Sequence, residues 1–369
     1  MNNAPMNTEP RPMPERTQVT GHAALEQRPE TARATVLGQL PGTNMVETVT
    51  MLRGELGAPH RGVLPILAAR SDVAHPVPRT ATVLTDLWTD LQPHGWRLTR
   101  HDGKESRAAA ALVASDVNVL ADVLGAETDG DRGPVVVELL GPMSLAASLH
   151  LHNGEKVLLD DGARRDVAEA LADGVGSHLR SVRDSADGRP IVLRLREPDL
   201  ARVLNGEVPT ASGYRTLRAV PKHEVDRAVE LLAESARAAG AAETELVLPD
   251  GVDPRHHAGG AVDRLYLAHP GSAAEDWEPI AAVVENDVRI GLLLPALTRG
   301  GSDRFVPVGR LVESVARPWT DLGLRAQLLD QVTVAPDAGL EAHAPHEVRR
   351  ATERATDLAH ALHEVALDA

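Results

Sequence analysis

Short apolar runs alternate with longer amphipathic segments along the chain from Ala34 onward. The apolar runs are nearly continuous, which is typical of parallel strands that are buried on both faces of a sheet. They predict strands over Ala34–Gly38, Val135–Leu140, Ile191–Leu195, Thr244–Leu248, Arg264–Ala268, Val288–Leu294 and Gln331–Ala335, with a shorter strand within Leu91–Leu98.

Between these runs, apolar residues recur every three or four positions, which predicts helices that include residues 168–182, 225–236 and 348–365. Alternating strands and helices of this number favour a single (β/α)8 barrel of the TIM type, in the α/β class. An open doubly wound sheet is the main alternative. The first strand is not followed by Gly-x-Gly-x-x-Gly, which counts against the dinucleotide-binding form of that sheet.

The first 33 residues differ from the rest of the chain. They contain five prolines, show no apolar periodicity, and balance four acidic residues with four arginines. We therefore expect a disordered, proline-rich tail over residues 1–33 and one barrel domain over residues 34–369.

Composition excludes several classes of protein. The chain has 38 Lys and Arg against 53 Asp and Glu, a net charge of −15, which argues against a partner with a phosphate backbone. No stretch approaches the roughly 20 apolar residues of a membrane span, and the N-terminus lacks the apolar region of a secretory signal. We expect a cytoplasmic protein with a small-molecule ligand, and neither nucleic acid nor a membrane as partner. The chain has no cysteine, which excludes thiolate catalysis and Cys-ligated zinc.

Polar residues at predicted strand ends are the candidate site, because a barrel of this type has its active site in the loops that follow its strands. Glu197 is the candidate catalytic residue, and an ion pair with Arg196 would lower its pKa; a strand-end ion pair without a ligand is the alternative. The sequence predicts no metal site; His269 is the one candidate ligand considered further, and it has no evident co-ligand. The candidate substrate-binding residues are Gln39, Gln92, Arg196, Asp250 and Asp337.

Four segments, in chain order, resemble one known family. They read LGQLPGTNMVETVTMLRGELGAPH, DLQPHGWRL, GPMSLAASLHLHNGEKVLLDDGARRDVAEALADGVGSH and EPDLARVLNGEVPTASGYRTLRAV. Together they are similar to the short, single-barrel cobalamin-independent methionine synthase-like proteins of actinobacteria, from Leu37 to the C-terminus and most strongly up to Val220. The resemblance implies a (β/α)8 barrel and a methyltransferase of the 5-methyltetrahydrofolate–homocysteine type, which acts in methionine biosynthesis at a zinc ion.

The resemblance also implies where the zinc ligands would lie. The family uses a His-x-Cys pair after one strand, a Glu after the next strand and a Cys near the last strand. The corresponding positions here lie around Leu246-Val247-Leu248, at the end of the Leu267-Ala268-His269 segment and at Ala338, so no ligand is retained in type.

Two substrate-binding patterns of the family also differ. Its Gly-Ser-x-Pro pattern reads Gly38-Gln39-Leu40-Pro41, and its Asp-Glu-Pro pattern reads Arg196-Glu197-Pro198. The family's Asp helps to hold the amino group of homocysteine, which an arginine would repel. The sequence thus predicts a methionine synthase-like barrel in which methyl transfer is lost or altered. The alternative function is a catalytically silent barrel that acts as a small-molecule sensor or a protein scaffold.

Overall fold

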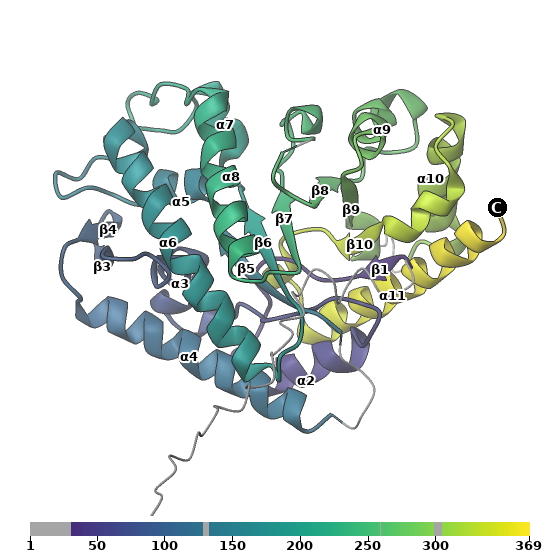
Figure 1. The fold of residues 1–369 in the computed structure, drawn as a ribbon, viewed down its shortest axis with the longest axis horizontal. Coiled ribbons are helices and arrows are strands. Elements are labelled where there is room, and N and C mark those ends of the chain that lie inside the picture. Colours follow the sequence, from purple (N-terminus) through teal and green to yellow (C-terminus); the bar gives the residue numbers. More distant parts are fainter. Residues whose placement is uncertain (1–30, 128–132, 259, 299–304) are drawn as a thin grey trace, which may run out of the picture.

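The computed structural model describes residues 31–127, 133–258, 260–298 and 305–369. Eight parallel strands form one curled sheet with helices around it (Figure 1), so the α/β class is confirmed. The predicted tail lies outside the described residues up to residue 30, and Arg33 already belongs to the first strand. The strands of the sheet are β1 (Arg33–Ala34), β2 (Gly62–Val63), β5 (Val135–Leu140), β6 (Ile191–Arg196), β7 (Glu243–Val247), β8 (Arg264–Ala268), β9 (Arg289–Leu294) and β10 (Thr333–Pro336).

The helices follow the predicted amphipathic segments. The three helices with the clearest sequence periodicity, α6, α8 and α11, bury the predicted apolar faces. At the start of α2, the Asn44 side chain accepts a hydrogen bond from the backbone N–H of Glu47, as its position before a helix predicts. The helices are α2 (Met45–Glu55), α3 (Pro76–Ala81), α4 (Lys104–Gly125), α5 (Pro142–Ser148), α6 (Asp161–Ser185), α7 (Leu200–Asn205), α8 (Lys222–Ala238), α9 (Glu278–Glu285), α10 (Val308–Asp321) and α11 (Pro345–Leu367).

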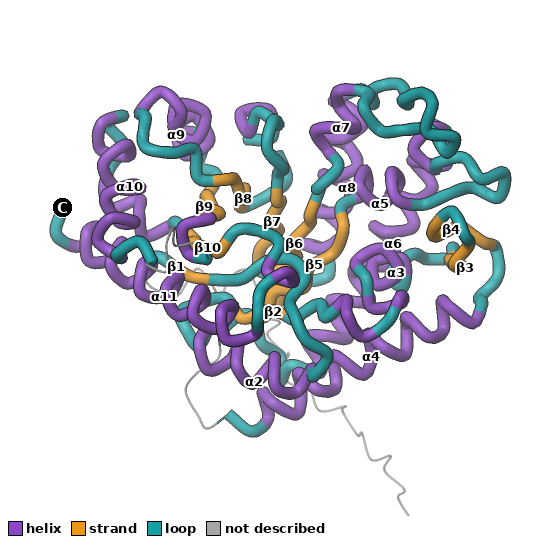
Figure 2. The backbone as a smooth tube through the Cα atoms, turned by 180° about the vertical axis from the view of Figure 1, so that it is seen from behind, coloured by secondary structure: helices purple, strands orange, loops and turns teal. Residues whose placement is uncertain are grey.

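The predicted strand within Leu91–Leu98 is wrong. This segment forms an antiparallel hairpin, β3 (Trp88–Gln92) and β4 (Gly95–Thr99), which is a separate sheet. Figure 2 shows the hairpin apart from the parallel sheet. The segment turns back at Pro93 and His94, and Gly95 takes a φ of +123° that favours glycine. The second strand of the parallel sheet is instead β2, whose two residues are too few to give a sequence signal.

The predicted closed barrel is also corrected. The strand order is β1-β10-β9-β8-β7-β6-β5-β2, so within the described ranges no regular strand pairing joins β1 to β2. Single hydrogen bonds link the two edges, from Arg61 N to Ala34 O and from Leu40 N to Ile66 O, both at 2.9 Å. The Thr35 hydroxyl donates a hydrogen bond to Arg61 O at 3.0 Å, so a side chain takes the place of a backbone N–H as donor to this carbonyl. Gly38 has a φ of +75°, which is not an extended conformation. These local departures interrupt the ladder at the seam.

The inner side of the curled sheet is charged. The strand registers place Arg194, Glu245 and Arg264 next to one another on β6, β7 and β8, and all three are 0% exposed. Glu245 accepts from Arg194 Nε at 2.7 Å and from Arg61 Nη1 at 2.8 Å. Barrels of this type usually fill these layers with Val, Ile and Leu. Here an ion-pair network fills the centre of the sheet, and the aliphatic core lies between the sheet and the helices.

Helix α4 corrects the expectation that no stretch could span a membrane. By length and composition alone, this one helix among the described residues is long and apolar enough to do so. In the structure it packs against α2, α3 and α6. Its Asp116 is buried and accepts hydrogen bonds from Arg70 at 2.6 Å and from Arg79 at 2.5 Å. A buried carboxylate in two ion pairs thus anchors α4 to the rest of the domain.

Candidate functional site

Glu197 follows β6 and caps the first turn of α5. It is 0% exposed, and its two carboxylate oxygens accept the backbone N–H groups of Met143 at 2.9 Å and Ser144 at 2.7 Å. A Cβ atom at Gly141 would lie 2.3 Å from Glu197 Oε1, so this approach needs glycine there. The Gly-Pro-Met-Ser and Glu-Pro segments that stood out in the sequence therefore meet at this contact.

The ionisation of Glu197 differs from the expectation. Burial raises its pKa to about 7, against the hydrogen bonds from Ser144 and Met143, which lower it. The expected ion pair with Arg196 is not formed, because successive side chains of a strand point to opposite faces. The expectation that Arg196 lowers this pKa is therefore wrong. A carboxyl group that titrates near neutral pH could exchange a proton, but this one is enclosed by backbone.

Arg196 belongs to a second cluster, which joins the ends of β1, β5 and β6. Its Nη1 lies 3.4 Å from Glu138 Oε1, and Gly38 N donates to both Glu138 oxygens at 3.1 and 3.2 Å. A Cβ atom at Gly38 would lie 2.7 Å from Arg196 Nη1, so the guanidinium lies directly on this glycine. Sequence reasoning did not select Glu138, although a lone acid inside the apolar run VVVELL was a visible signal. The charge of Arg196 is thus partly compensated within the protein.

The residues at the family's zinc positions do not fit a zinc ion. Leu246 and Leu248 are buried, and Val247 packs in an apolar cluster with Leu37, Tyr266, Leu293 and Ala335 at the carboxyl end of the sheet. Ala338 is exposed and offers no donor atom. Zinc in proteins is bound by Cys sulfur, His nitrogen and carboxylate oxygen. The aliphatic side chains at these positions therefore cannot supply a zinc site.

His269 lies at the end of β8 without a set of co-ligands. Its Nδ1 accepts a hydrogen bond from Gly271 N at 3.1 Å, and its ring lies 5.4 Å from the Trp277 ring in an edge contact. Burial lowers the pKa of His269, which favours the neutral ring. Throughout the part of the chain that the structure describes, no three His, Asp or Glu side chains are grouped so that they could hold a metal ion.

The remaining candidates lie apart from Glu197. Gln39 is half-buried at the β1–β2 seam, opposite Ile66, and Gln92 lies on the separate hairpin. Asp250 is exposed after β7, and Asp337 accepts a hydrogen bond from Ala338 N at 2.8 Å. Among the described residues, no hydrogen bond or ion pair joins these four side chains to one another or to Glu197. They remain predictions as substrate-binding residues.

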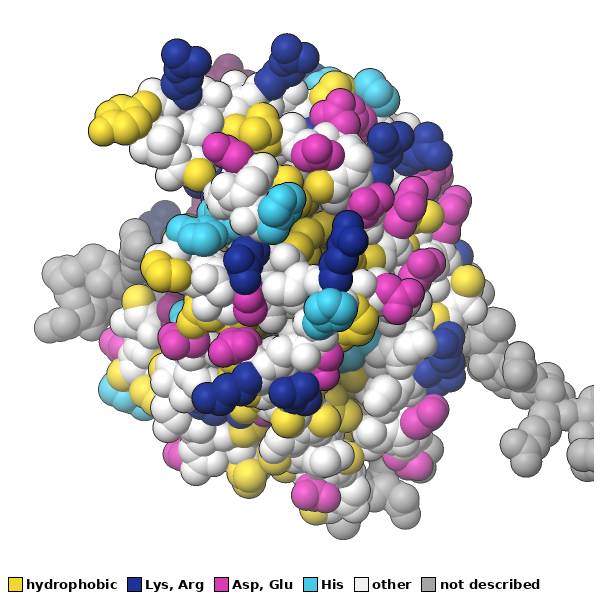
Figure 3. Space-filling model, turned by 90° about the vertical axis from the view of Figure 1, so that its left-hand side faces the viewer, with side chains coloured by type: hydrophobic (Ala, Val, Ile, Leu, Met, Phe, Trp, Pro, Cys, Tyr) yellow, Lys and Arg dark blue, Asp and Glu magenta, His cyan; other side chains and the backbone are white. Residues whose placement is uncertain are grey.

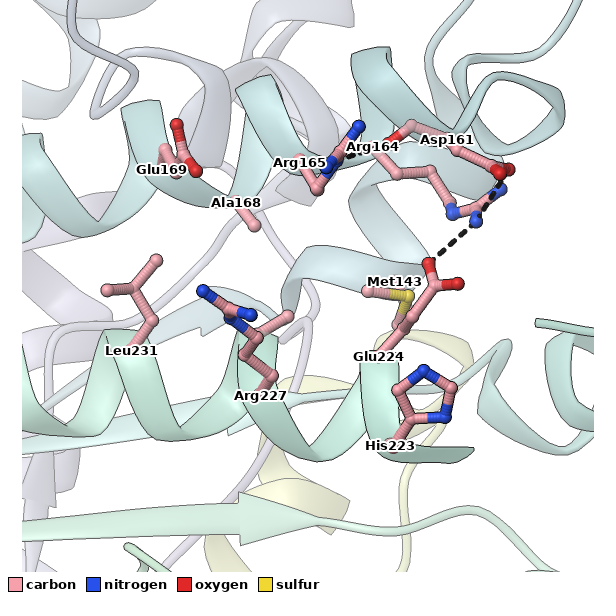
Figure 4. Close-up of a pocket in the computed structure, with 11 residues that line it drawn as sticks. Met143, Asp161, Arg164, Arg165, Ala168, Glu169, His223, Glu224, Arg227 and Leu231 are labelled. Carbon is pink, nitrogen blue, oxygen red and sulfur yellow. Dashed lines mark hydrogen bonds and ion pairs between the residues drawn. The ribbon is translucent and has the colours of Figure 1, made fainter. Parts of the chain in front are cut away.

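A groove between α6 and α8 was not predicted. It is a cavity of about 400 Å³ near the first turns of both helices (Figure 4). On one side Arg164 is neutralised, because its Nη2 binds Glu224 at 2.7 Å and Asp161 at 2.9 Å. The other two arginines of the groove, Arg165 and Arg227, are exposed and make no ion pair within the described ranges.

Part of the wall of this groove is apolar. Ala168 and Ala228 provide small side chains on facing helices, with Met143 and Leu231 beside them. Figure 3 shows one face of the molecule, on which hydrophobic side chains are visible in recesses among Lys, Arg and His side chains. Asp161, Glu169 and Glu224 also line the groove, so its three arginines are matched by three carboxylates. Among the described residues, Arg165 and Arg227 make no ion pair with these acids, so their guanidinium groups could bind an anionic group of a small molecule. The groove could not be predicted from the sequence, because the sequence does not show that α6 packs against α8.

Comparison with known proteins gives a likeness of fold. No family model matches the chain, and no curated protein matches it. The solved structure of a B12-independent methionine synthase from Shewanella sp. W3-18-1, in complex with selenomethionine, matches with a TM-score of 0.58 and 11% identity, over 92% of this chain and 100% of that chain. The carboxyl transferase domain of Rhizobium etli pyruvate carboxylase, at 12% identity over 94% of this chain and 57% of that one, has a TM-score of 0.24, too low to support an argument. The chain therefore has a fold similar to that of a methionine synthase.

Proposed function

We propose that this protein, whose fold is similar to that of a methionine synthase, has lost zinc-dependent methyl transfer and acts as a binding protein for a small anionic molecule. The observation that carries the first part is the donor set at the carboxyl end of the sheet. The positions of the family's His and Cys ligands hold leucine, valine and alanine, and Val247 is packed among aliphatic and aromatic neighbours. His269, near the position of the family's Glu, has no set of co-ligands among the described residues.

The chemistry of the reaction explains why this matters. A thiol with an ordinary pKa of about 8.5 is mostly protonated at neutral pH, and a bound metal ion makes it a thiolate nucleophile. The described residues offer no set of ligands for that metal, so they do not supply this activation of homocysteine. Arg196 supports this proposal, because a cation that already binds Glu138 stands at the position that the resemblance assigns to the Asp that holds the substrate's amino group.

The binding role is supported by the groove between α6 and α8. Among the described residues, Arg165 and Arg227 make no ion pair, although Glu169 lines the same groove, and Ala168, Ala228 and Met143 offer an apolar surface. A ligand with a carboxylate or phosphate at one end and a short apolar part would match both features. Binding of such a ligand favours the role of a small-molecule sensor over that of a protein scaffold.

The loss of methyl transfer can be tested in a methionine auxotroph. We expect that this chain, expressed at a level checked by immunoblot, does not restore growth without methionine, whereas an active B12-independent methionine synthase does. Growth that depends on this chain would contradict the proposal.

The groove can be tested by calorimetry with butanoate, hexanoate and octanoate as probes. We expect saturable binding that strengthens with chain length and that weakens about tenfold in Arg227→Gln, which removes one charged hydrogen-bond donor. Arg180→Gln, on an exposed part of α6 outside the groove, is the matched control. Absence of binding to the unmodified protein, or equal affinity in Arg227→Gln, would contradict this part of the proposal.

A further inference from the structure

The amino-terminal end of the parallel sheet holds a surplus of buried positive charge. Glu243, on β7, is 3% exposed and faces several guanidinium groups. Arg61 Nη2 lies 2.6 Å from Glu243 Oε2, and Arg289 Nη1 lies 2.9 Å from Glu243 Oε1. Arg264 Nε is 3.8 Å from the same carboxylate. Arg33, on β1, adds a further guanidinium whose charge interacts with this group. The carboxylate of Glu243 thus interacts with four arginines at this end of the sheet.

The carboxylate of Glu245, which lies two residues further along β7, does not balance this surplus of positive charge. Glu245 is bound by Arg61 at 2.8 Å and by Arg194 at 2.7 Å, with Arg264 Nε at 3.6 Å. Glu138 Oε2 lies 3.9 Å from Arg194 Nη1, but Glu138 also forms an ion pair with Arg196. Without counting Arg289, the carboxylates of Glu243 and Glu245 therefore face four guanidinium groups among the described residues, those of Arg33, Arg61, Arg194 and Arg264.

Several guanidinium N–H groups in this layer are buried without an acceptor. Arg61 Nε and both Nε and Nη2 of Arg264 have no hydrogen-bond partner among the described residues. Arg61 and Arg264 are each 0% exposed. The remaining nitrogen of Arg264, Nη1, donates to the backbone carbonyls of Ile290 and Gln331. A buried donor without an acceptor and a buried charge without a counter-charge are both costly, and one bound anion would relieve both.

The electrostatics of Arg33 agree with this geometry. Burial, together with the neighbouring positive charges of Arg61 and Arg264, lowers the pKa of Arg33 to about 9. Its guanidinium has no hydrogen bond or ion pair within the described part of the chain. A group in this position gains from a negative charge placed between it and the other two arginines.

We propose that the amino-terminal end of the sheet is a binding site for a small inorganic anion, held by the guanidinium groups of Arg33, Arg61 and Arg264. Planar guanidinium groups present paired N–H donors that match phosphate oxygens, and they also bind halide ions. The site lies at the end of the strands opposite to Arg196 and Glu197. It is therefore independent of the groove between α6 and α8 and of the proposed function.

The proposal is tested by thermal unfolding of the full chain at constant ionic strength, with sodium gluconate replaced stepwise by inorganic phosphate or by chloride. We expect a saturable rise in Tm of about 5 °C with at least one of these ions. In Arg33→Gln the rise should be lost, while the Tm in gluconate stays equal to or above that of the unmodified protein, because a repelling charge has been removed. A purely structural role for Arg33 would lower the Tm in both buffers.

Two controls separate the alternatives. Arg310→Gln, an exposed arginine on α10, should keep the full response to the anion. A carboxylate of the chain itself could supply the negative charge in place of a bound anion. Glu30→Gln tests this alternative, because Glu30 precedes β1 by three residues in the sequence. A lower Tm in gluconate for Glu30→Gln, with no anion response in the unmodified protein, would overturn the proposal in favour of that carboxylate.

A direct measurement does not depend on any variant. Crystals soaked in sodium bromide should show an anomalous peak within hydrogen-bond distance of Arg264 Nη2. No peak at this position, together with equal Tm values in gluconate, phosphate and chloride, would overturn the proposal.

Discussion

Substitution of Glu197 by glutamine isolates the energetic effect of one enclosed carboxyl group. Glu197 is 0% exposed, and burial raises its pKa to about 7 from an ordinary value of 4.5. Between these two pH values the folded state therefore binds more protons than the unfolded state. The contribution of Glu197 to stability is fully present below pH 4.5 and is lost as the pH rises through 7.

The size of the effect follows from the two pKa values. The free energy of unfolding should fall by about 1.4 kcal/mol for each pH unit in this interval, and by about 3 kcal/mol overall. Glutamine cannot ionise, so Glu197→Gln should not show this slope. Its amide can accept only one of the two N–H groups that Met143 and Ser144 donate, which costs about 1–3 kcal/mol at every pH.

The assay is urea unfolding of both proteins at pH 4.5, 5.5, 6.5 and 7.5. The difference in free energy of unfolding between the two proteins cancels the titration of all other groups. We expect the free energy of unfolding of the unmodified protein, relative to that of Glu197→Gln, to fall by about 3 kcal/mol across this range, so that its advantage at pH 4.5 is lost or reversed at pH 7.5. A constant difference would refute the raised pKa. A difference that grows with pH would show that the N–H groups of α5 hold the carboxylate ionised in spite of its burial.

Two further predictions concern the inner side of the sheet. Glu245→Gln removes the carboxylate that binds Arg61 and should destabilise the protein by about 3–5 kcal/mol in urea unfolding. The exposed substitution Glu313→Gln should cost less than about 1 kcal/mol, and equal costs would contradict the importance of the buried network. Gly291→Ala places a Cβ atom 2.2 Å from the Tyr266 ring and should cost about 1–3 kcal/mol. Adding Tyr266→Leu should recover part of that loss in a double-mutant cycle, and strictly additive effects would contradict this contact.

Much of the fold could be predicted because its signals are local. The runs over Val135–Leu140 and Arg264–Ala268 correspond to β5 and β8, and the helical periodicity of residues 348–365 lies within α11. The β1–β2 seam could not be predicted, because β2 has only two residues. Its cross-links are single hydrogen bonds between residues that are distant in sequence. The hairpin was misplaced because an apolar alternation does not show which sheet it joins.

The candidate site was predictable in part. The sequence pointed to Arg196 and Glu197 at the end of β6, and both lie there, but their partners were not predictable. Glu197 binds the backbone of α5, and Arg196 binds Glu138, because alternate side chains of a strand face opposite sides. The buried charges at Arg194 and Glu245 were visible as ionisable residues inside apolar runs. Their role depends on the strand registers, which the sequence alone does not determine.

The most direct test of the central claim is the zinc content and methyl-transfer activity of one preparation of the purified protein. The protein would be produced in zinc-supplemented medium, dialysed, measured by inductively coupled plasma mass spectrometry, and then incubated with homocysteine and a 5-methyltetrahydrofolate donor. We predict far less than one zinc per chain and no methionine, because the positions of the family's His and Cys ligands hold aliphatic side chains and His269 has no set of co-ligands among the described residues. One tightly bound zinc per chain together with methionine formation would contradict the account.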